Sequence, residues 1–406
     1  MKKFVSLLFA IFTIVSIIFI GGCSKNDNKK NEYKTFLEYC QDKNLNDVTK
    51  KTITALMRVS DAKDCDSAQK ILEKNTLLNL AQRGEIVDLT PLAQFTHLET
   101  IDLSFNNIVD IKPLANLKKL SGINLSHNKI KDITPLEELV LLQGLNLGYN
   151  QITDISPLKN IIKLKALELS YNQIKDISPI KNMMELTGLN VSTNQIESIS
   201  ILKKLINLEG LDFSRNKIKD IEPLGDLNKL SGIYAFQNEL TDISPLKKLN
   251  KIEILNLAAN KITDISVLKN LPKLNSLYLD DNKITSIEAL KENLDLKGLA
   301  ISNNLITDIS PLKSITGILA IDLSKNKVSD ISPLKELANV VALRLQNNAI
   351  TSVIPLLELT KIQELQLENN PLKKNNNSCP TNSKHTLINS ACSKAFSSSS
   401  PTANTK

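Results

Sequence analysis

Hydrophobic residues recur with a period of 22 along most of the chain. Each period carries leucine or a similar aliphatic residue at the first, fourth and sixth places of a nine-residue stretch that ends in asparagine, as in residues 164–172 (LKALELSYN). The closing asparagine occurs thirteen times between Asn106 and Asn370, without an insertion or deletion between copies. Such strict self-similarity predicts a repeat architecture in which successive turns of chain stack.

Alternation of the fourth and sixth places with polar residues predicts a short strand whose two leucines face inward. One turn cannot bury its apolar face alone, so consecutive turns must share a core and place their strands side by side in a parallel sheet. The asparagine stands where the chain leaves the strand. Its side chain can satisfy backbone groups that would otherwise be buried and unpaired, so we expect these asparagines to be structural.

A second motif follows each asparagine, as in residues 150–158 (NQITDISPL). Its Asp suits the start of a short helical turn, and its Pro suits the first positions of that turn. The two motifs together resemble the 22-residue leucine-rich repeats best known from the bacterial internalins, over residues 86–372. This resemblance implies an α/β leucine-rich repeat solenoid of about thirteen turns, with a curved parallel sheet on the concave face and short 3-10 turns on the convex face.

The first residues have the pattern of an export signal. Two lysines precede an apolar stretch from Phe4 to Ile20, which leads into the sequence IGGC ending at Cys23. This ending resembles the lipobox of bacterial lipoproteins. The resemblance implies a signal peptide over residues 1–22, a lipid on Cys23, a flexible tether over residues 23–33, and a place on the outer membrane or cell surface. An uncleaved membrane anchor is the alternative, because the stretch is nearly long enough to span a bilayer.

The flanks of the repeats are expected to act as caps, because a stacked solenoid would otherwise expose its core and its sheet edges. Apolar residues at helical spacing predict helices at 47–59 and 66–73, within a helical N-terminal cap over residues 34–85. Residues 373–395 are expected to form a C-terminal cap. The Ser-rich residues 396–406 are expected to be a disordered tail.

Four further cysteines lie only in these flanks, at Cys40, Cys65, Cys379 and Cys392. Cysteines of exported proteins are commonly paired. We expect the bonds Cys40–Cys65 and Cys379–Cys392, because any other pairing would bridge opposite ends of a long repeat array. Neither pair has the close Cys or His neighbours of a zinc site, so no metal is expected.

Nothing in the sequence indicates an enzyme. It contains no nucleophile elbow, phosphate loop or HExxH motif, and only three histidines. The formal charge of +7 is spread among many lysines and aspartates, which is a weak argument for a nucleic-acid partner. We expect a monomer without cofactors that binds a protein partner and is held to the membrane through the lipid on Cys23.

Aromatic residues are only 4% of the chain, yet several fall at places that the repeat exposes. The eighth place of four consecutive repeats reads Phe, His, Tyr and Tyr, and strands ~4.8 Å apart would make this row about 14 Å long. Exposed aromatics often anchor binding hot spots, although they also favour exposed strand positions for structural reasons. The candidate partner-binding residues on the concave face are Phe105, His127, Tyr149, Tyr171, Arg215, Tyr234, Phe236 and Tyr278.

The leading hypothesis is therefore a lipid-anchored envelope protein that recognises a protein partner through its sheet face. By resemblance to the internalins, this recognition could serve adhesion or host recognition. A periplasm-facing structural scaffold is the first alternative. A glycan-binding lectin is the second, since tyrosine ring faces can stack on sugars.

Overall fold

A computed structural model describes residues 34–82, 84–373, 378–379 and 386–398. The chain divides into two compact units, Met1–Asn216 (unit 1) and Lys217–Lys406 (unit 2). The expected signal peptide, lipidated Cys23 and tether lie outside the described residues.

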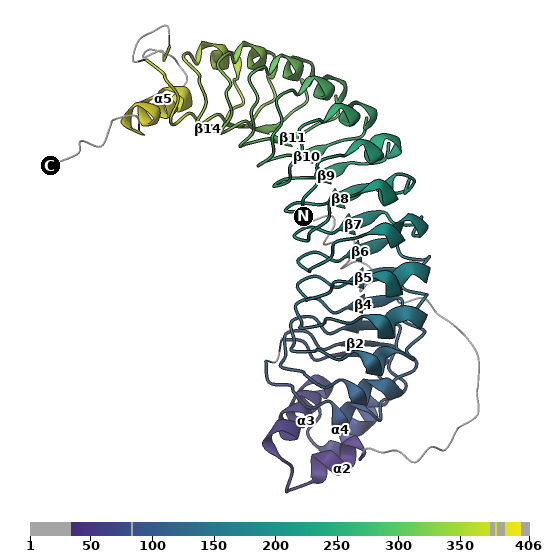
Figure 1. Ribbon diagram of the computed structural model, residues 1–406. Helices are drawn as coiled ribbons and strands as arrows, with labels where there is room; N and C mark the ends of the chain where they lie inside the picture. Colours follow the sequence, from purple (N-terminus) through teal and green to yellow (C-terminus); the bar gives the residue numbers. More distant parts are fainter. Residues whose placement is uncertain (1–33, 83, 374–377, 380–385, 399–406) are drawn as a thin grey trace, which may run out of the picture. The chain divides into compact units, whose positions relative to one another are not determined.

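The described part of unit 1 begins at residue 34 with three helices and continues with short strands that alternate with 3-10 helices (Figure 1). The helices are α2 (Phe36–Gln41), α3 (Asp47–Ser60) and α4 (Cys65–Leu72). The strands are β1 (Leu77–Asn79), β2 (Thr100–Asp102), β3 (Gly122–Asn124), β4 (Gly144–Asn146), β5 (Ala166–Glu168), β6 (Gly188–Asn190) and β7 (Gly210–Asp212). The 3-10 helices are η1 (Thr90–Leu92), η2 (Lys112–Asn116), η3 (Thr134–Leu136), η4 (Ser156–Asn160), η5 (Ser178–Asn182) and η6 (Ser200–Lys204).

Unit 2 continues the same alternation and ends in a helix, α5 (Thr386–Ser398). In Figure 1 its strands line the inner side of a bend and its 3-10 helices the outer side. The strands are β8 (Gly232–Tyr234), β9 (Ile254–Asn256), β10 (Ser276–Tyr278), β11 (Gly298–Ala300), β12 (Ala320–Asp322), β13 (Ala342–Arg344) and β14 (Glu364–Gln366). The 3-10 helices are η7 (Glu222–Leu224), η8 (Ser244–Lys248), η9 (Ser266–Asn270), η10 (Glu288–Glu292), η11 (Ser310–Ser314), η12 (Ser332–Glu336) and η13 (Ile354–Glu358).

Within each unit, neighbouring strands pair in parallel and follow the order of the chain, which confirms the leucine-rich repeat solenoid. Leu145 stands opposite Leu167, for example, so the register repeats the 22-residue period of the sequence. The expected boundary between cap and repeats at residue 86 is one strand too late, although Leu77 and Leu80 were expected to begin an irregular first turn. β1 already pairs with β2, with Leu77 opposite Thr100 at an offset of 23 residues, so the sheet begins inside the segment assigned to the cap.

The repeated asparagines tie adjacent turns together, as expected. Asn128 is buried, and its Nδ2 donates to the carbonyl oxygens of Leu103 and Leu125, both at 3.0 Å. Its Oδ1 accepts from the backbone nitrogen of Ile108 at 3.0 Å. Leu103 and Ile108 belong to the preceding turn, so one side chain satisfies buried backbone groups on both sides of a repeat boundary.

The repeated aspartates open the 3-10 turns, but from a position slightly earlier than a normal N-cap residue. Asp154 Oδ1 accepts from the backbone nitrogen of Ser156, the first residue of η4, at 2.8 Å, while Ile155 occupies the N-cap position itself. Serine can take over this contact at a longer distance. Ser198 Oγ accepts from Ser200 at 3.3 Å, so the repeats that lack Asp keep the same turn.

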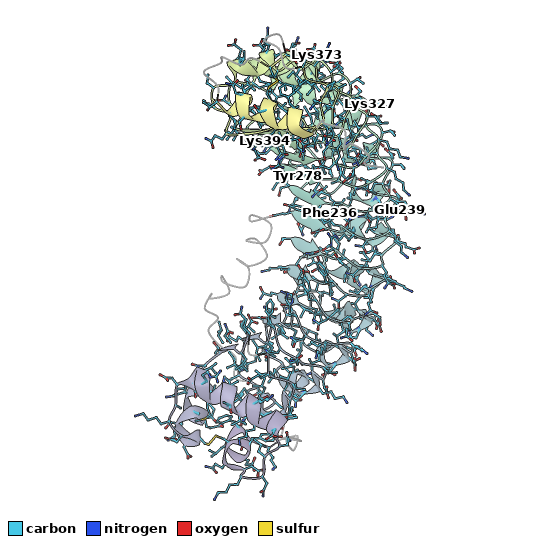
Figure 2. The ribbon with its side chains drawn as sticks, turned by 90° about the vertical axis from the view of Figure 1, so that its left-hand side faces the viewer. Phe236, Glu239, Tyr278, Lys327, Lys373 and Lys394 are labelled. Carbon is cyan, nitrogen blue, oxygen red and sulfur yellow. A yellow bond between two sulfur atoms is a disulfide. The ribbon has the colours of Figure 1, made fainter. Side chains whose placement is uncertain are left out.

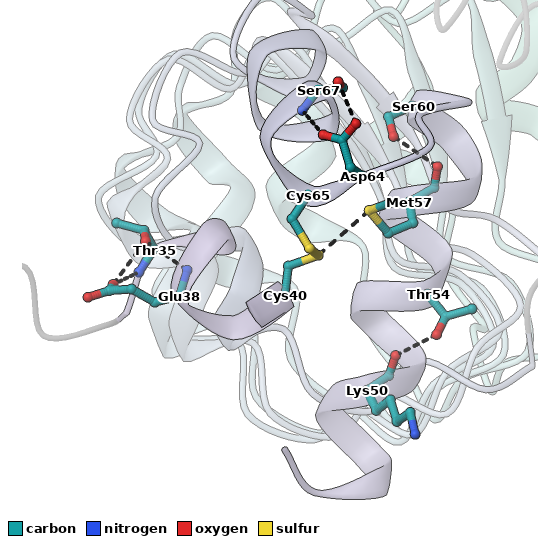
Figure 3. The surroundings of a disulfide bond; sticks show 10 residues. All are labelled: Thr35, Glu38, Cys40, Lys50, Thr54, Met57, Ser60, Asp64, Cys65 and Ser67. Carbon is teal, nitrogen blue, oxygen red and sulfur yellow. Dashed lines mark hydrogen bonds between the residues drawn. A yellow bond between two sulfur atoms is a disulfide. The ribbon is translucent and has the colours of Figure 1, made fainter. Parts of the chain in front are cut away.

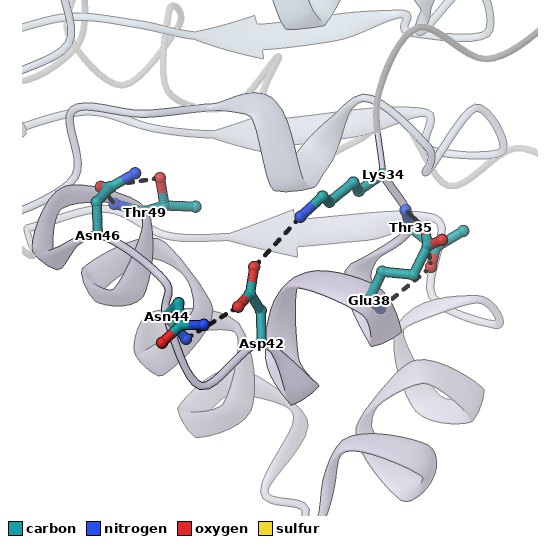
Figure 4. A network of polar contacts seen from close by, with 7 residues as sticks. All are labelled: Lys34, Thr35, Glu38, Asp42, Asn44, Asn46 and Thr49. Carbon is teal, nitrogen blue, oxygen red and sulfur yellow. Dashed lines mark hydrogen bonds and ion pairs between the residues drawn. The ribbon is translucent and has the colours of Figure 1, made fainter.

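The N-terminal cap is helical, as expected, and contains one helix, α2, that the hydrophobic spacing did not indicate. Figure 3 shows the bond between Cys40 and Cys65, which joins α2 to α4. Each helix begins at a capped residue: Figure 4 shows Asn46 Oδ1 accepting from the backbone nitrogen of Thr49 at 2.9 Å at the start of α3. The hydroxyl of Thr52 donates to the carbonyl oxygen of Asp88 at 2.7 Å and holds α3 to the first turn of the solenoid.

The C-terminal cap consists of α5 and the bond between Cys379 and Cys392, the second expected pair. Buried Ile388 and Ala395 face inward from α5. The tail was expected to start at residue 396, which is wrong at its beginning because α5 continues to Ser398. Across the part of the chain that the structure describes, no helix is both long and apolar enough to cross a membrane.

Candidate functional site

The aromatic residues at the eighth place of the repeat lie in the turn that follows each strand, not on the strand. In unit 1 they have positive φ angles, 56° at Phe105, 55° at His127, 56° at Tyr149 and 52° at Tyr171. A left-handed backbone costs a non-glycine residue about 1–2 kcal/mol, and the repeats at Asn303 and Asn347 place the more tolerant asparagine there. Strand propensity therefore does not explain these four aromatic residues.

The four rings form one continuous stack, which we call the aromatic ladder (Phe105, His127, Tyr149 and Tyr171). Successive ring centroids lie 3.9, 4.0 and 4.0 Å apart, with interplanar angles of 11°, 15° and 11°. The rings are closer together than the ~4.8 Å between strands, so they lean toward one another and the ladder is shorter than expected.

Much of the ladder remains exposed to solvent despite this stacking. Phe105 is 47% exposed, Tyr149 40% and Tyr171 37%. Because each inner ring is covered on both faces by its neighbours, the ladder presents ring edges and tyrosine hydroxyls. Partial burial lowers the pKa of His127, which favours the neutral imidazole within the stack.

A half-buried carboxyl group lies at the tyrosine end of the ladder. Glu168, the last residue of β5, accepts from the backbone nitrogen of Ser170 at 2.7 Å and from Asn190 Nδ2 at 2.8 Å. Burial outweighs these hydrogen bonds and raises the pKa of Glu168 to about 7. Burial, the hydroxyl of Tyr171 and the charge of Glu168 raise the pKa of Tyr149 to about 12, so its hydroxyl stays protonated at neutral pH.

We expect Glu168→Asn to stabilise unit 1 above neutral pH. The raised pKa means that the folded state favours protonated Glu168, so this contribution to stability is complete below about pH 4 and is lost as the pH rises through about 7. Asn124, Asn146 and Asn190 occupy the same place in neighbouring repeats, so asparagine fits the turn. The variant should gain about 1–2 kcal/mol at pH 8, measured by urea unfolding at several pH values.

The control for this experiment is Asp102→Asn, which removes a negative charge at the same repeat position near the other end of the ladder. If Glu168→Asn unfolds with the same pH dependence as the unmodified protein between pH 4 and pH 8, the Glu168 carboxyl does not titrate in this range.

The remaining candidate residues have different surroundings. Arg215 is exposed in unit 1, at the same repeat place as the ladder, and its charge acts on Tyr149. In unit 2, Tyr278 is 41% exposed and Phe236 is partly exposed (Figure 2). The prediction for Tyr234 as a displayed anchor is wrong: this residue is only 7% exposed, and its ring packs beside Gly232.

Sequence reasoning named the four ladder residues but missed their left-handed backbone and their stacking. It also did not single out Glu168. A signal was present, since Glu168 interrupts a row in which most neighbouring repeats have asparagine or aspartate. Among the described residues, no group of three or more His, Cys, Asp or Glu side chains is arranged to hold a metal ion.

Comparison with known proteins agrees with this architecture. The family model "Leucine Rich repeats (2 copies)" matches residues 96–138, 118–160, 140–182, 162–204, 206–248, 229–270 and 250–292. An internalin from Listeria monocytogenes, InlF, is similar with 34% identity and a TM-score of 0.76, over 79% of this chain and 95% of that one. The chain therefore belongs to the internalin-type leucine-rich repeat proteins. Proteins of this kind typically serve as binding scaffolds.

Two further solved structures share the fold at lower identity. The leucine-rich repeat protein LIC12759 of Leptospira interrogans has 24% identity and a TM-score of 0.70, over 79% of this chain and 87% of that one. The Arabidopsis receptor kinase HAESA was solved with the peptide hormone IDA and the co-receptor SERK1. It has 23% identity and a TM-score of 0.61, over 73% of this chain and 53% of that one. A search of curated proteins finds no match.

Proposed function

We propose that this protein binds a protein partner through the aromatic ladder of unit 1, while a lipid on Cys23 holds it on a bacterial envelope. The exposed stack of four aromatic residues on a left-handed backbone is the observation that carries the proposal. Aromatic side chains on a rigid support present a large contact area at little loss of conformational entropy on binding, as hot-spot residues do. Adhesion to another cell, or recognition of a host surface, is the role we assign to this contact.

The chemistry of the ladder favours a protein over a glycan. Sugars bind aromatic residues by lying on a free ring face, and the faces of His127 and Tyr149 are covered by neighbouring rings. The accessible ring edges carry positive partial charge, and the tyrosine hydroxyls can donate or accept. Backbone carbonyls and carboxylates of a protein partner suit this surface.

We expect Tyr149→Asn combined with Tyr171→Asn to lower the affinity for the partner by about tenfold to a hundredfold, the usual effect of removing hot-spot side chains. Asparagine tolerates the left-handed backbone, so the fold should be kept. The measurement is the binding of the labelled full-length protein to intact cultured host cells, with circular dichroism as the check on folding.

The matched control is Lys325→Asn, which makes the same type of change at the equivalent left-handed position of unit 2. Equal binding by the double variant and the unmodified protein would refute the ladder as the contact. Binding that is lost when the cells are treated with glycosidase but kept after mild protease treatment would favour the lectin instead.

The location of the protein requires a separate experiment. Protease added to intact bacterial cells should degrade this protein while a periplasmic protein survives, as expected for a lipoprotein that faces outward. Protection until the envelope is permeabilised would refute a role in adhesion and favour the periplasm-facing scaffold.

A further inference from the structure

A row of exposed aliphatic side chains runs along unit 1 at the other end of the strands. Val140, Ile162, Met184 and Ile206 occupy one place in four consecutive repeats, in the turns between a 3-10 helix and the next strand. They are 46%, 50%, 47% and 56% exposed. The residue before each of them is fully buried, so the core is already filled. We call this row the aliphatic ridge.

Folding does not require apolar residues at this place. The equivalent residue is Lys118 in an earlier repeat of unit 1, and Asn228 and Asn250 in repeats of unit 2, where the same turn forms. The packing of the turns is maintained by other contacts, such as Asn207 Nδ2 donating to the carbonyl oxygen of Met184 at 2.7 Å. Four consecutive exposed aliphatic residues therefore indicate a surface that meets something apolar.

The charges beside the ridge are mostly positive. The three turns at residues 159–163, 181–185 and 203–207 carry exposed Lys159, Lys163, Lys181, Lys203 and Lys204, against a single acid, Glu185. The turn that holds Val140 contains two acids, and both are paired with lysines. Glu137 lies 3.3 Å from Lys159, and Glu138 lies 2.6 Å from Lys118.

This combination fits a lipid surface better than a protein partner. Protein hot spots are enriched in Trp, Tyr and Arg, and none of these occurs in the four ridge positions or the three lysine-bearing turns. Aliphatic residues that enter the headgroup region, flanked by lysines that meet anionic lipids, are the pattern of interfacial membrane binding.

We propose that the aliphatic ridge lies in the headgroup region of an anionic bilayer, so that the lipid on Cys23 and the ridge together fix the orientation of unit 1. The inference rests on the proposed lipid anchor. Ten residues lie between Cys23 and Lys34, where the described chain begins, and the eleven steps from one to the other could span at most about 35–40 Å. The ridge precedes the strands and the ladder follows them, so this orientation directs the ladder away from the membrane.

The test uses the absence of tryptophan from this chain. Ile162→Trp in the lipidated full-length protein creates a single fluorescent reporter on the ridge. The protein is inserted into phosphatidylcholine vesicles that contain phosphatidylglycerol and lipids brominated near the headgroup. We expect the emission to shift to the blue and to be quenched by the brominated lipids. Met184→Trp provides a second reporter should Ile162→Trp fold poorly.

The control is Phe105→Trp, which places the reporter on the ladder and should not be quenched. Emission from Ile162→Trp that brominated lipids leave unchanged, on protein that floats with the vesicles, would overturn the ridge proposal while the anchor stands. A blue shift that increases with protein concentration and is not accompanied by quenching would show that a second copy of the protein covers the ridge. This result would also overturn the ridge proposal. Protein that does not float with the vesicles would refute the lipid anchor and the ridge proposal that depends on it.

Discussion

Replacing Asn128 by alanine should lower the free energy of unfolding of unit 1 by about 3–5 kcal/mol. The substitution removes the donor to the carbonyl oxygens of Leu103 and Leu125 and the acceptor for the backbone nitrogen of Ile108. These backbone groups stay buried, so each one loses its partner without gaining water. The measurement is urea unfolding followed by circular dichroism.

The matched control for Asn128→Ala is Asn160→Ala, at an exposed asparagine in the same unit, which should change the stability by less than about 0.5 kcal/mol. Repeat proteins transmit stability through contacts between neighbouring turns, so the damage should be centred on the turns around β2 and β3, which the lost hydrogen bonds join. A loss for Asn128→Ala as small as that for the control would show that water, rather than the side chain, can satisfy this junction.

The register of the solenoid was predictable because the same 22-residue pattern of leucine and asparagine recurs in thirteen copies. A leucine that faced outward in one turn would leave a hole in the core of both neighbouring turns, so every copy must keep the same phase. The role of the asparagine followed from a count of backbone groups that need partners. Every turn needs inward leucines and an asparagine that pairs with buried backbone groups. The same residues therefore recur at the same places, and the recurrence can be recognised in the sequence.

The eighth place of the repeat could not be assigned in the same way, because many residue types occupy it. The left-handed backbone is imposed by the turn and not by the residue, so it occurs equally at Phe105, Arg215 and Asn347. Ring stacking depends on side-chain angles that a spacing pattern does not contain. The ring of Tyr234 packs beside Gly232, a contact between two residues of one strand that an inward-outward alternation ignores.

The boundary between the cap and the repeats was placed one strand too late for a related reason. β1 pairs with β2 at an offset of 23 residues, and the segment between them contains Gln82 and Gly84 with positive φ angles but no closing asparagine. A search for the repeat motif therefore passes over this segment, although its backbone still forms a turn of the solenoid. Strand pairing needs backbone partners and a shared core, which Leu78 and Leu80 supply even without the motif.

Removing the bond between Cys40 and Cys65 is expected to destabilise the N-terminal cap by about 3 kcal/mol, since the bond closes a loop with a sequence separation of 25. The variant is Cys40→Ala combined with Cys65→Ala. The bond restricts the unfolded cap, whose helices are too short to be stable alone and depend on burying Phe36 and Leu56. Hydrogen exchange at the backbone amide of Leu56 measures the effect.

The loss should be confined to one end of the protein, because the cap covers the first turns of unit 1 through Phe36, whose ring centroid lies 6.2 Å from that of Phe95. Cys379→Ala with Cys392→Ala removes the other bond and should leave exchange at Leu56 unchanged, so this variant controls for the loss of a disulfide in general. If Leu56 exchanges equally slowly in both double variants, packing against the solenoid alone holds the cap. If it exchanges faster only without Cys40 and Cys65, the cap depends on its disulfide, and reducing conditions will open this end of the core.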